Sequence, residues 1–200
     1  MVPLPGTDRV ALLLWNVINM KPYIESHAYL NKQPWNRHTM TRLTLPDTII
    51  GDDTIVCSNA VIYAGTTIGH HCFIADGASI REGVTIGHHT LIGRNVTIEN
   101  DTIIGDHVMI QTAAHITGNC ILEDHVFIGP EVCTMNDKYM GLKPTHLQGP
   151  HIRKQAVIGG NATILPGVVI GPHVVIGAGS VVTKDVEEGT WVGNPLRRLE

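Results

Sequence analysis

The chain has 200 residues, which is enough for one sizeable domain with its own core. Aromatic residues make up only 4% and the net charge is −4 without a basic stripe, so a nucleic-acid partner has little support. The four cysteines lack CxxC spacing and are expected to be reduced core thiols, with no metal bound. The apolar run from Val10 to Trp15 is too short to span a bilayer. These features predict a soluble, cytoplasmic protein without a membrane span.

Residues 1–48 show no six-residue repeat. Thr7 or Asp8 could cap a short helix that ends before Pro22. Its apolar side chains would be Val10, Leu13, Leu14, Val17 and Ile18. We expect this segment to cover the open end of the structure that follows, with help from three aromatic residues: Trp15, Tyr23 and Trp35. A role in substrate binding is the alternative.

From Ile49 to Val132 the sequence divides into fourteen consecutive blocks of six residues. The second residue of every block is a branched aliphatic, which is isoleucine in twelve blocks and Val56 or Leu122 in the other two. The sixth residue is always small or β-branched: Thr54, Ala60, Thr66, Cys72, Ala78, Val84, Thr90, Val96, Thr102, Val108, Ala114, Cys120, Val126 and Val132. Such a strict repeat predicts a solenoid before any other signal is considered.

Six residues per repeat fit a short strand followed by a tight corner. The aliphatic residue then points inward, its neighbours point outward, and the sixth residue turns the corner. Three blocks close a triangular coil of eighteen residues, and the coils stack at about 4.8 Å, the spacing of paired strands. One residue type recurs at this interval, always fifth in its block, and should form a ladder along one edge: His71, His89, His107 and His125. Protonation of this ladder could make the assembly sensitive to pH.

The repeat is interrupted after Val132 and its register returns at Val157. We expect eighteen extra residues within Cys133 to Ala156. An insertion in so regular a repeat lies outside the stacked core, so this stretch is the first place to look for function. The alternative is a loop that only locks neighbouring subunits together.

Five further blocks run from Val157 to Val186, with inward residues at Ile158, Ile164, Ile170, Ile176 and Val182. Residues 187–200 form a tail that is expected to turn back over the last coil. The expected architecture is an all-β, three-sided prism with a cap segment at 1–48, a repeat domain at 49–186 that carries a long loop insertion within 133–156, and a tail at 187–200.

Three stretches besides the hexads carry a family likeness: Ile110 to Pro130, the sequence TMND at Thr134 to Asp137, and AVIGGNATILPGVVIG through GAGSVVTKDV to VGNPLRRL. Together they resemble the bacterial hexapeptide-repeat acetyltransferases, most closely those that acetylate amino sugars carried on nucleotides. The resemblance covers residues 49–198. It implies a left-handed parallel β-helix, although crossovers between parallel strands are nearly always right-handed.

The resemblance also implies a homotrimer with acetyl-CoA in the groove between adjacent prisms. Small residues would line this slot: Gly160, Ala162, Ala178 and Gly179. Basic residues would meet the nucleotide phosphates: Lys184, Arg197 and Arg198. Each of the three could instead be an ordinary solvated charge.

Acyl transfer needs an acceptor nitrogen or oxygen near the thioester, help with its proton and stabilisation of the developing oxyanion. His115 is on the same prism face as Cys133, one coil away, beside the root of the insertion. Asp137 could orient or deprotonate the acceptor while Asn136 hydrogen-bonds it. A hydroxyl acceptor would need His115 or a loop histidine such as His146. The alternatives are an outward histidine satisfied by a neighbouring coil and an Asn-Asp pair that initiates a turn.

The chain departs from its apparent family at two positions. Some amino-sugar members place a histidine base where this chain has Gly118, and others place a substrate-binding asparagine where it has Thr112 or Ala113. Neither assignment transfers to this sequence. An amine acceptor could pass its proton to the departing thiolate without a strong protein base.

Two other functions are open alternatives. Zinc carbonic anhydrases built on this prism use two histidines five residues apart and a third two coils earlier, and here the third ligand is missing: His71 and His107 meet Thr112, and His89 and His125 meet Pro130. A non-catalytic trimeric scaffold is disfavoured by the insertion and the closing segment. The resemblance therefore implies transfer of an acetyl group from acetyl-CoA to an amino or hydroxyl group of a sugar at the trimer interface, with nitrogen favoured over oxygen and the sugar carried on a nucleotide.

Overall fold

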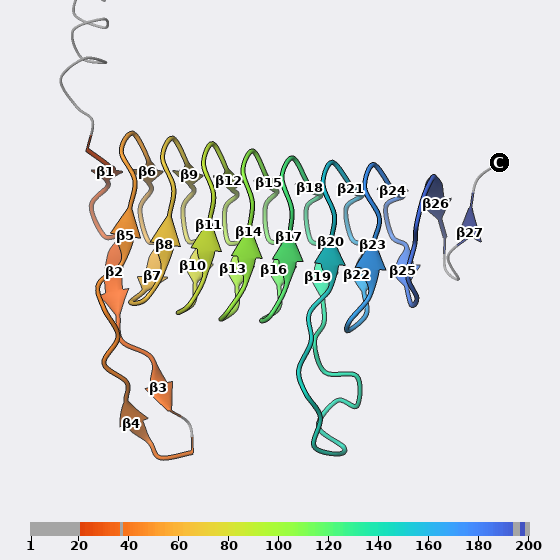
Figure 1. Ribbon diagram of the computed structural model, residues 1–200. Helices are drawn as coiled ribbons and strands as arrows, with labels where there is room; N and C mark the ends of the chain where they lie inside the picture. Colours follow the sequence, from red (N-terminus) through yellow and green to blue (C-terminus); the bar gives the residue numbers. More distant parts are fainter. Residues whose placement is uncertain (1–20, 37, 194–196, 199–200) are drawn as a thin grey trace, which may run out of the picture.

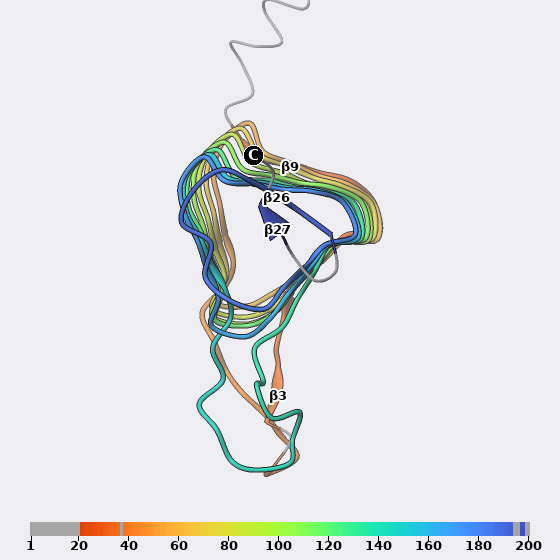
Figure 2. The ribbon, with the colours of Figure 1, turned by 90° about the vertical axis from the view of Figure 1, so that its right-hand side faces the viewer.

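The computed structural model describes residues 21–36, 38–193 and 197–198, and this part of the chain contains strands and no helix. Short strands alternate with tight corners and wind into a three-sided parallel β-helix (Figures 1 and 2). The all-β prism expected from the hexads is confirmed, and its arrangement is consistent with the left-handed form. The helix expected between Val10 and Ile18, and Trp15, lie outside the described residues. None of the described segments offers a long apolar helix that could cross a membrane.

Three sheets form the faces of the prism. The first face contains β1 (Tyr23–Ile24), β6 (Ile55–Val56), β9 (Phe73–Ile74), β12 (Leu91–Ile92), β15 (Met109–Ile110), β18 (Phe127–Ile128), β21 (Val157–Ile158), β24 (Val175–Ile176), β26 (Thr190–Val192) and β27 (Arg197–Arg198). The second face contains β2 (Tyr29–Lys32), β7 (Val61–Tyr63), β10 (Ser79–Ile80), β13 (Thr97–Ile98), β16 (His115–Ile116), β19 (Cys133–Thr134), β22 (Thr163–Ile164) and β25 (Val181–Val182). The third face contains β5 (Ile49–Ile50), β8 (Thr67–Ile68), β11 (Thr85–Ile86), β14 (Ile103–Ile104), β17 (Ile121–Leu122), β20 (His151–Ile152) and β23 (Val169–Ile170).

The core is a column of aliphatic side chains that stack on themselves. Ile80 pairs in register with Ile62 on one side and Ile98 on the other, and all three are fully buried. The outward residues beside them, such as Ser79 and Thr97, stay partly exposed. Burying apolar area stabilises each rung by roughly 25 cal/mol per Å², so the repeat of inward isoleucines fixes the register of every coil.

The corners explain which residues occupy the fifth position of a block. His89, Asn95 and Asp101 have φ angles of 54°, 54° and 56°, in the left-handed region of the backbone. Asn, Asp and His enter this region more readily than other side chains, so the same corner accepts all three. Ala113 and Glu131 adopt it as well, at 60° and 58°. These two residues precede the second-face strands at the base of the insertion.

The N-terminal segment differs from the expectation. β1 pairs in parallel with β6, and β2 pairs with β7, so residues 23–32 form two sides of an additional coil. Leu30 packs against the core at that end. Tyr23 and Trp35 are 57% and 53% exposed, so the cover expected from them is not formed. The expected absence of repeats before residue 49 is therefore wrong for YIESHA and YLNKQP, two hexads that start at Tyr23.

Two excursions leave the prism at the corner between the second and third faces, here called the arm corner (Figures 1 and 2). The first arm, residues 33–47, carries the antiparallel pair β3 (Trp35–Asn36) and β4 (Thr41–Arg42). The second arm, residues 135–150, lies between β19 and β20. β18 pairs with β21 thirty residues later instead of eighteen, so the second arm adds twelve residues. The expected eighteen is wrong because HIRKQA, from His151 to Ala156, is a regular hexad.

The tail closes the other end of the prism. β26 continues the first face by pairing with β24, which brings Trp191 beside Ile176 and against the core. β27 then runs antiparallel to β26. The apolar end of the last coil is thereby partly covered.

Candidate functional site

The second arm is fastened to the prism by short polar contacts at its root. Asn136 Nδ2 donates to the carbonyl of Gly118 at 3.2 Å, and its own carbonyl accepts from the backbone N–H of Gln148 at 2.9 Å. The carboxylate of Asp137 accepts hydrogen bonds from the N–H groups of Tyr139 and Gly141, at 2.8 and 2.7 Å. Both carboxylate oxygens of Asp137 thus hold a turn within the arm. Asp137 therefore stabilises a turn of the arm, and Asn136 joins the root of the arm to the prism.

His115 lies on the second face beside this root, half-buried, and its strand neighbour is Cys133. Nδ1 of His115 is 2.7 Å from Oγ1 of Thr97 on the preceding coil. The backbone of the same strand is held by Thr134, whose hydroxyl donates to the carbonyl of His115 and accepts from the N–H of Thr117, at 3.2 and 2.8 Å. The structure therefore brings His115 and Asn136 to adjacent coils and fixes the ring and backbone of His115 independently.

Thr134 is an exception to the hexad rule that the sequence reasoning passed over. It occupies the second, inward position of its block, where the other blocks carry an aliphatic residue, and it is 1% exposed. Its hydroxyl makes the two hydrogen bonds just described, so among the described residues no buried polar side-chain atom is left unpaired. A threonine at a position that is otherwise aliphatic was the sequence signal that could have identified Thr134 as a residue that holds the backbone of His115.

A second polar pair lies on the third face, below the returning limb of the arm. Nε2 of His151 is 2.7 Å from Oε1 of Glu123, and the N–H of Lys154 donates to Oε2 of the same carboxylate at 2.9 Å. A hollow of about 510 Å³ lies beside this pair, and its wall includes Ile121, His146 and His151. The sequence reasoning had named His146 but neither His151 nor Glu123.

The small residues expected to line the acetyl-CoA slot divide into two groups. Gly160, Ala178 and Gly179 lie at the corner between the first and second faces and are at least partly exposed. Gly179 has φ +68° and a Cβ there would meet no atom within 4 Å, so the surface beside it is open. Ala162 is fully buried, because it is the sixth residue of its block and points into the core. Its expected place in the slot is therefore wrong.

The basic residues of the tail gather at the C-terminal end. Lys184 and Arg198 line one hollow of about 580 Å³ together with Trp191. Nη2 of Arg198 is 3.0 Å from Oε1 of Glu188, so this guanidinium is already paired on the surface. Arg197 lies next to Arg198 in β27.

The histidine ladder has the expected form. The rings of His71, His89, His107 and His125 stack with centroids 4.8 Å apart and planes within 8° of parallel. Beside them runs a column of acceptors, in which each side chain accepts from a backbone N–H one coil earlier: His70, His88, Asp106 and Asp124. Rings stacked face to face do not direct three nitrogen lone pairs at one point, as a zinc ion requires.

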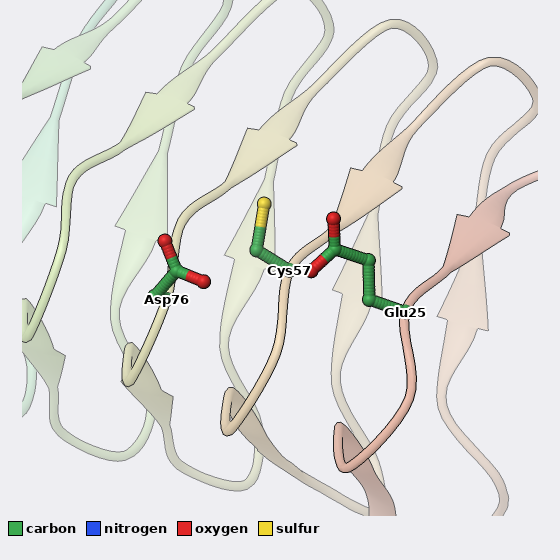
Figure 3. Close-up of side chains that lie close together, drawn as sticks. All are labelled: Glu25, Cys57 and Asp76. Carbon is green, nitrogen blue, oxygen red and sulfur yellow. The ribbon is translucent and has the colours of Figure 1, made fainter.

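A group of possible metal ligands lies near the N-terminal end, where Glu25, Cys57 and Asp76 come from three successive coils (Figure 3). Oε2 of Glu25 already accepts from the N–H and the hydroxyl of Ser58, both at 2.9 Å. Burial and the two carboxylates raise the pKa of the Cys57 thiol, which favours its protonated, non-ligating form. The group therefore ties the first coil to the next, and we assign no ion to it.

Two family models match the chain. The model described as the GMPPB C-terminal domain matches residues 44–145, and the model described as the bacterial transferase hexapeptide (six repeats) matches residues 149–184. Among curated relatives, YvoF of Bacillus subtilis, which is provisionally named an acetyltransferase, is 53% identical over 47 residues, or 23% of this chain and 27% of its own length. The dTDP-3-amino-3,6-dideoxy-alpha-D-galactopyranose 3-N-acetyltransferase of Aneurinibacillus thermoaerophilus is 45% identical over 47 residues, or 23% of this chain and 24% of that enzyme. The chain thus spans about a quarter of the length of these relatives.

Solved structures share the architecture. A variant of GDP-perosamine N-acetyl transferase from Caulobacter crescentus, crystallised with CoA and GDP-perosamine, has a TM-score of 0.52 and 27% identity, over 60% of this chain and 52% of that one. The UDP-N-acetylglucosamine O-acyltransferase of Moraxella catarrhalis has a TM-score of 0.57 and 21% identity, over 88% of this chain and 71% of that one, a likeness of fold alone. Since the model of the GMPPB C-terminal domain covers half of the chain, the chain belongs to that family, and its closing coils match the bacterial transferase hexapeptide model.

Proposed function

We propose that the chain is an acetyl-CoA-dependent acetyltransferase that acetylates an amino group of a nucleotide-linked sugar, with a sugar hydroxyl as the alternative acceptor. The observation that carries the proposal is the joint likeness to a named amino-sugar N-acetyltransferase and to a structure that holds CoA and an amino-sugar nucleotide together. The second arm supports it, because a long excursion from so regular a prism supplies a surface that the flat faces lack.

In this proposal acetyl-CoA lies along the second face, in a crevice shared with a neighbouring protomer. Gly160, Ala178 and Gly179 offer an open, small-residue edge for the pantetheine. Lys184, which follows β25 of the second face, and Arg198, in β27 of the first face, line one hollow at the C-terminal end of the prism, where they would meet the phosphates. Arg197, the neighbour of Arg198 in β27, is the third basic residue proposed for this role. The thioester would then reach the root of the second arm, next to His115 and Asn136.

His115 is the proposed catalytic contact of the thioester. Nδ1 of His115 lies 2.7 Å from the Thr97 hydroxyl; in this proposal the hydroxyl donates to Nδ1, so that the proton of the neutral ring is on Nε2. Nε2–H can then donate to the carbonyl oxygen as it gains negative charge during attack. Asn136 and Asp137 keep the arm in place over this group, Asn136 through Gly118 and Asp137 through its turn.

The homotrimer is part of the proposal and is supported by an apolar row on the first face. Seven outward residues follow one another along its rungs: Ile55, Phe73, Leu91, Met109, Phe127, Val157 and Val175. Phe73 and Met109 are 40% and 45% exposed. A contiguous apolar strip of this kind marks an interaction surface, and closed rings of identical subunits are a common way to bury one. The proposal also places the reaction in the cytoplasm, where the four free cysteines stay unpaired.

Two measurements test the proposal. Acetyl-CoA should raise the melting temperature, because a ligand that binds the folded state stabilises it by mass action. Release of free thiol should then depend on an amino-sugar nucleotide, with GDP-perosamine and the dTDP-linked 3-amino-3,6-dideoxygalactose as first probes. A melting temperature that does not change at saturating acetyl-CoA would favour the non-catalytic scaffold.

A further inference from the structure

His151 is held in a way that suits proton transfer. Its Nε2 contacts Oε1 of Glu123 at 2.7 Å, and the carboxylate is itself fixed by the N–H of Lys154 at 2.9 Å on Oε2. An ionised carboxylate can only accept a hydrogen bond, so it places the proton of the neutral ring on the nitrogen that it contacts. Nδ1 of His151 is therefore the nitrogen left to accept a proton.

The pair of His151 and Glu123 is partly exposed, so it is accessible to a substrate. The side chains of His151 and Glu123 keep 33% and 36% of their surface exposed. Burial acts to raise the pKa of Glu123, but the hydrogen bonds from Lys154 and His151 and the charges of His151 and Arg153 outweigh it, so that its pKa is lowered. The carboxylate is thus ionised at neutral pH. Two further charged or titratable groups are near: Arg153, which acts on the Glu123 carboxylate, and His146, which lines the same hollow as His151.

The hollow beside the pair has two kinds of wall. Ile121, Leu147 and Val169 supply apolar surface, while Asn119 and Gln148 supply side-chain amides. A sugar ring also has two kinds of surface, apolar C–H faces and a rim of polar groups. The returning limb of the arm is pinned here, since the N–H of Gly167 donates to the carbonyl of Gln148 at 2.9 Å. The wall of the hollow therefore offers both kinds of surface that a sugar would contact.

The two histidines occupy the two faces that meet at the arm corner. His115 is on the second face, where the proposed donor lies, and His151 is on the third. Both start strands that adjoin the second arm: β16 is paired with β19, which leads into the arm, and β20 follows it. The inference requires the thioester of a donor on one face to reach the acceptor on the other face across this corner.

We propose that His151, oriented by Glu123, is the general base that takes the proton from the acceptor sugar, which binds in the hollow on the third face. This inference rests on the proposed acetyl transfer. An amino group is largely protonated near neutral pH and must lose a proton before it can attack. That proton passes to Nδ1 of His151, the nitrogen forms a bond to the thioester carbon, the carbon–sulfur bond breaks, and the thiolate takes up the second proton of the amine.

The experiment compares thiol release by wild type, His151→Ala, His151→Gln and Glu123→Gln with the two amino-sugar nucleotides as probes. His151→Ala should lower kcat/KM for the acceptor by ~10²- to 10⁴-fold, the usual contribution of a general base. In this variant the rise of kcat/KM with pH should follow the ionisation of the substrate amino group instead of that of a histidine, and added imidazole should restore part of the rate. Glu123→Gln should lose less of the rate, because the ring loses the carboxylate that orients it but keeps the nitrogen that accepts the proton.

His173→Asn is the matched control, because His173 is an exposed corner histidine with φ 59°, a conformation that asparagine accepts. It should keep the wild-type rate and pH profile. His151→Gln separates loss of the base from misfolding, since glutamine can still hydrogen-bond to Glu123. All variants should show the same rise in melting temperature with acetyl-CoA.

A wild-type pH profile in His151→Ala, with a rate within a few-fold of wild type, overturns the role of His151 and leaves the acetyl transfer standing. Binding of acetyl-CoA without turnover of either probe overturns the acceptor assignment and this inference with it. The proposed function itself fails if acetyl-CoA neither binds nor is consumed.

Discussion

Oγ1 of Thr97 lies 2.7 Å from Nδ1 of His115, on adjacent coils of the second face. The contact turns the histidine from a surface residue into an oriented one, because the hydroxyl fixes the ring and selects which nitrogen remains for substrate. The backbone of His115 is held separately through Thr134. Ring orientation and strand position can therefore be tested by different substitutions.

If Nε2 of His115 stabilises the developing oxyanion, His115→Ala should lower kcat by ~10²- to 10³-fold. His115→Gln keeps a donor and should recover part of the loss. Thr97→Val removes the partner of Nδ1 and should lower kcat without changing KM for acetyl-CoA, since it frees the ring but leaves the slot intact. Steady-state thiol release measures all three. A rate for His115→Ala within a few-fold of wild type rules out a catalytic contact.

Thr134→Val should destabilise the fold, although it makes the inward position aliphatic like the others. The substitution leaves the buried N–H of Thr117 without an acceptor, which costs ~1–3 kcal/mol of unfolding free energy. Thr134→Ser retains the hydroxyl and serves as the control. Chemical denaturation compares the two variants with wild type, and equal stability of the Thr134→Val variant and wild type would contradict the assignment of this hydroxyl.

The prism could be predicted from the sequence because every coil repeats the same pattern of an inward aliphatic residue and a small or β-branched sixth residue. Second-position residues such as Ile98 and sixth-position residues such as Val96 are fully buried, as the six-residue period requires. The histidine ladder followed from the same period. Local periodicity and global architecture agree in this fold, and such agreement is what makes a fold predictable.

The contacts around the arm could not be predicted in the same way. His151 and Glu123 are 28 residues apart, and they meet only because the second arm is looped out and the register resumes at His151. An insertion of eighteen residues would leave His151 outside the repeat, whereas the actual twelve place it in register with Ile121. The sequence puts Asp137 in the insertion, but whether its carboxylate faces substrate or its own turn depends on backbone angles that a sequence does not display.

Lowering the pH below about 6.5 should destabilise the fold through the histidine ladder. The pKa of His89 is lowered, first by desolvation and then by the positive charges of His107, His71 and His88, while Asp106 acts in the opposite direction. A folded-state pKa below the unfolded value means that protons bind the unfolded chain more readily. The neutral His89 ring therefore contributes to the stability of the fold above the ordinary histidine pKa of 6.5, and this contribution is lost as the pH falls through the lowered pKa of the folded state.

Melting curves between about pH 8 and pH 5 measure this effect. His89→Asn keeps the left-handed corner, as Asn95 does at the next corner of the chain, and removes the charge from the middle of the stack. The variant should lose less of its melting temperature on acidification than wild type. His173 lies outside the stack, so His173→Asn should leave the pH dependence of the melting temperature unchanged. If the melting temperature falls equally with pH in all three proteins, the histidine ladder is not the cause of the fall.

Met109→Arg should dissociate the assembly if the apolar row of the first face is the interface between protomers. Met109 lies in the middle of that row, between Leu91 and Phe127, and is 45% exposed in the single chain. A buried, unpaired guanidinium is costly, so the substitution should reduce the mass in solution from that of a trimer to that of one chain. Thr85→Arg, at an exposed outward position on the third face, is the control and should leave the mass unchanged.

Light scattering coupled to gel filtration gives the masses, and thiol release measured on the same samples tells whether the crevice needs a neighbouring protomer. Dissociation that leaves the rate intact would place the whole site within one protomer, whereas a wild-type protein that is already monomeric would remove the shared crevice from the proposal.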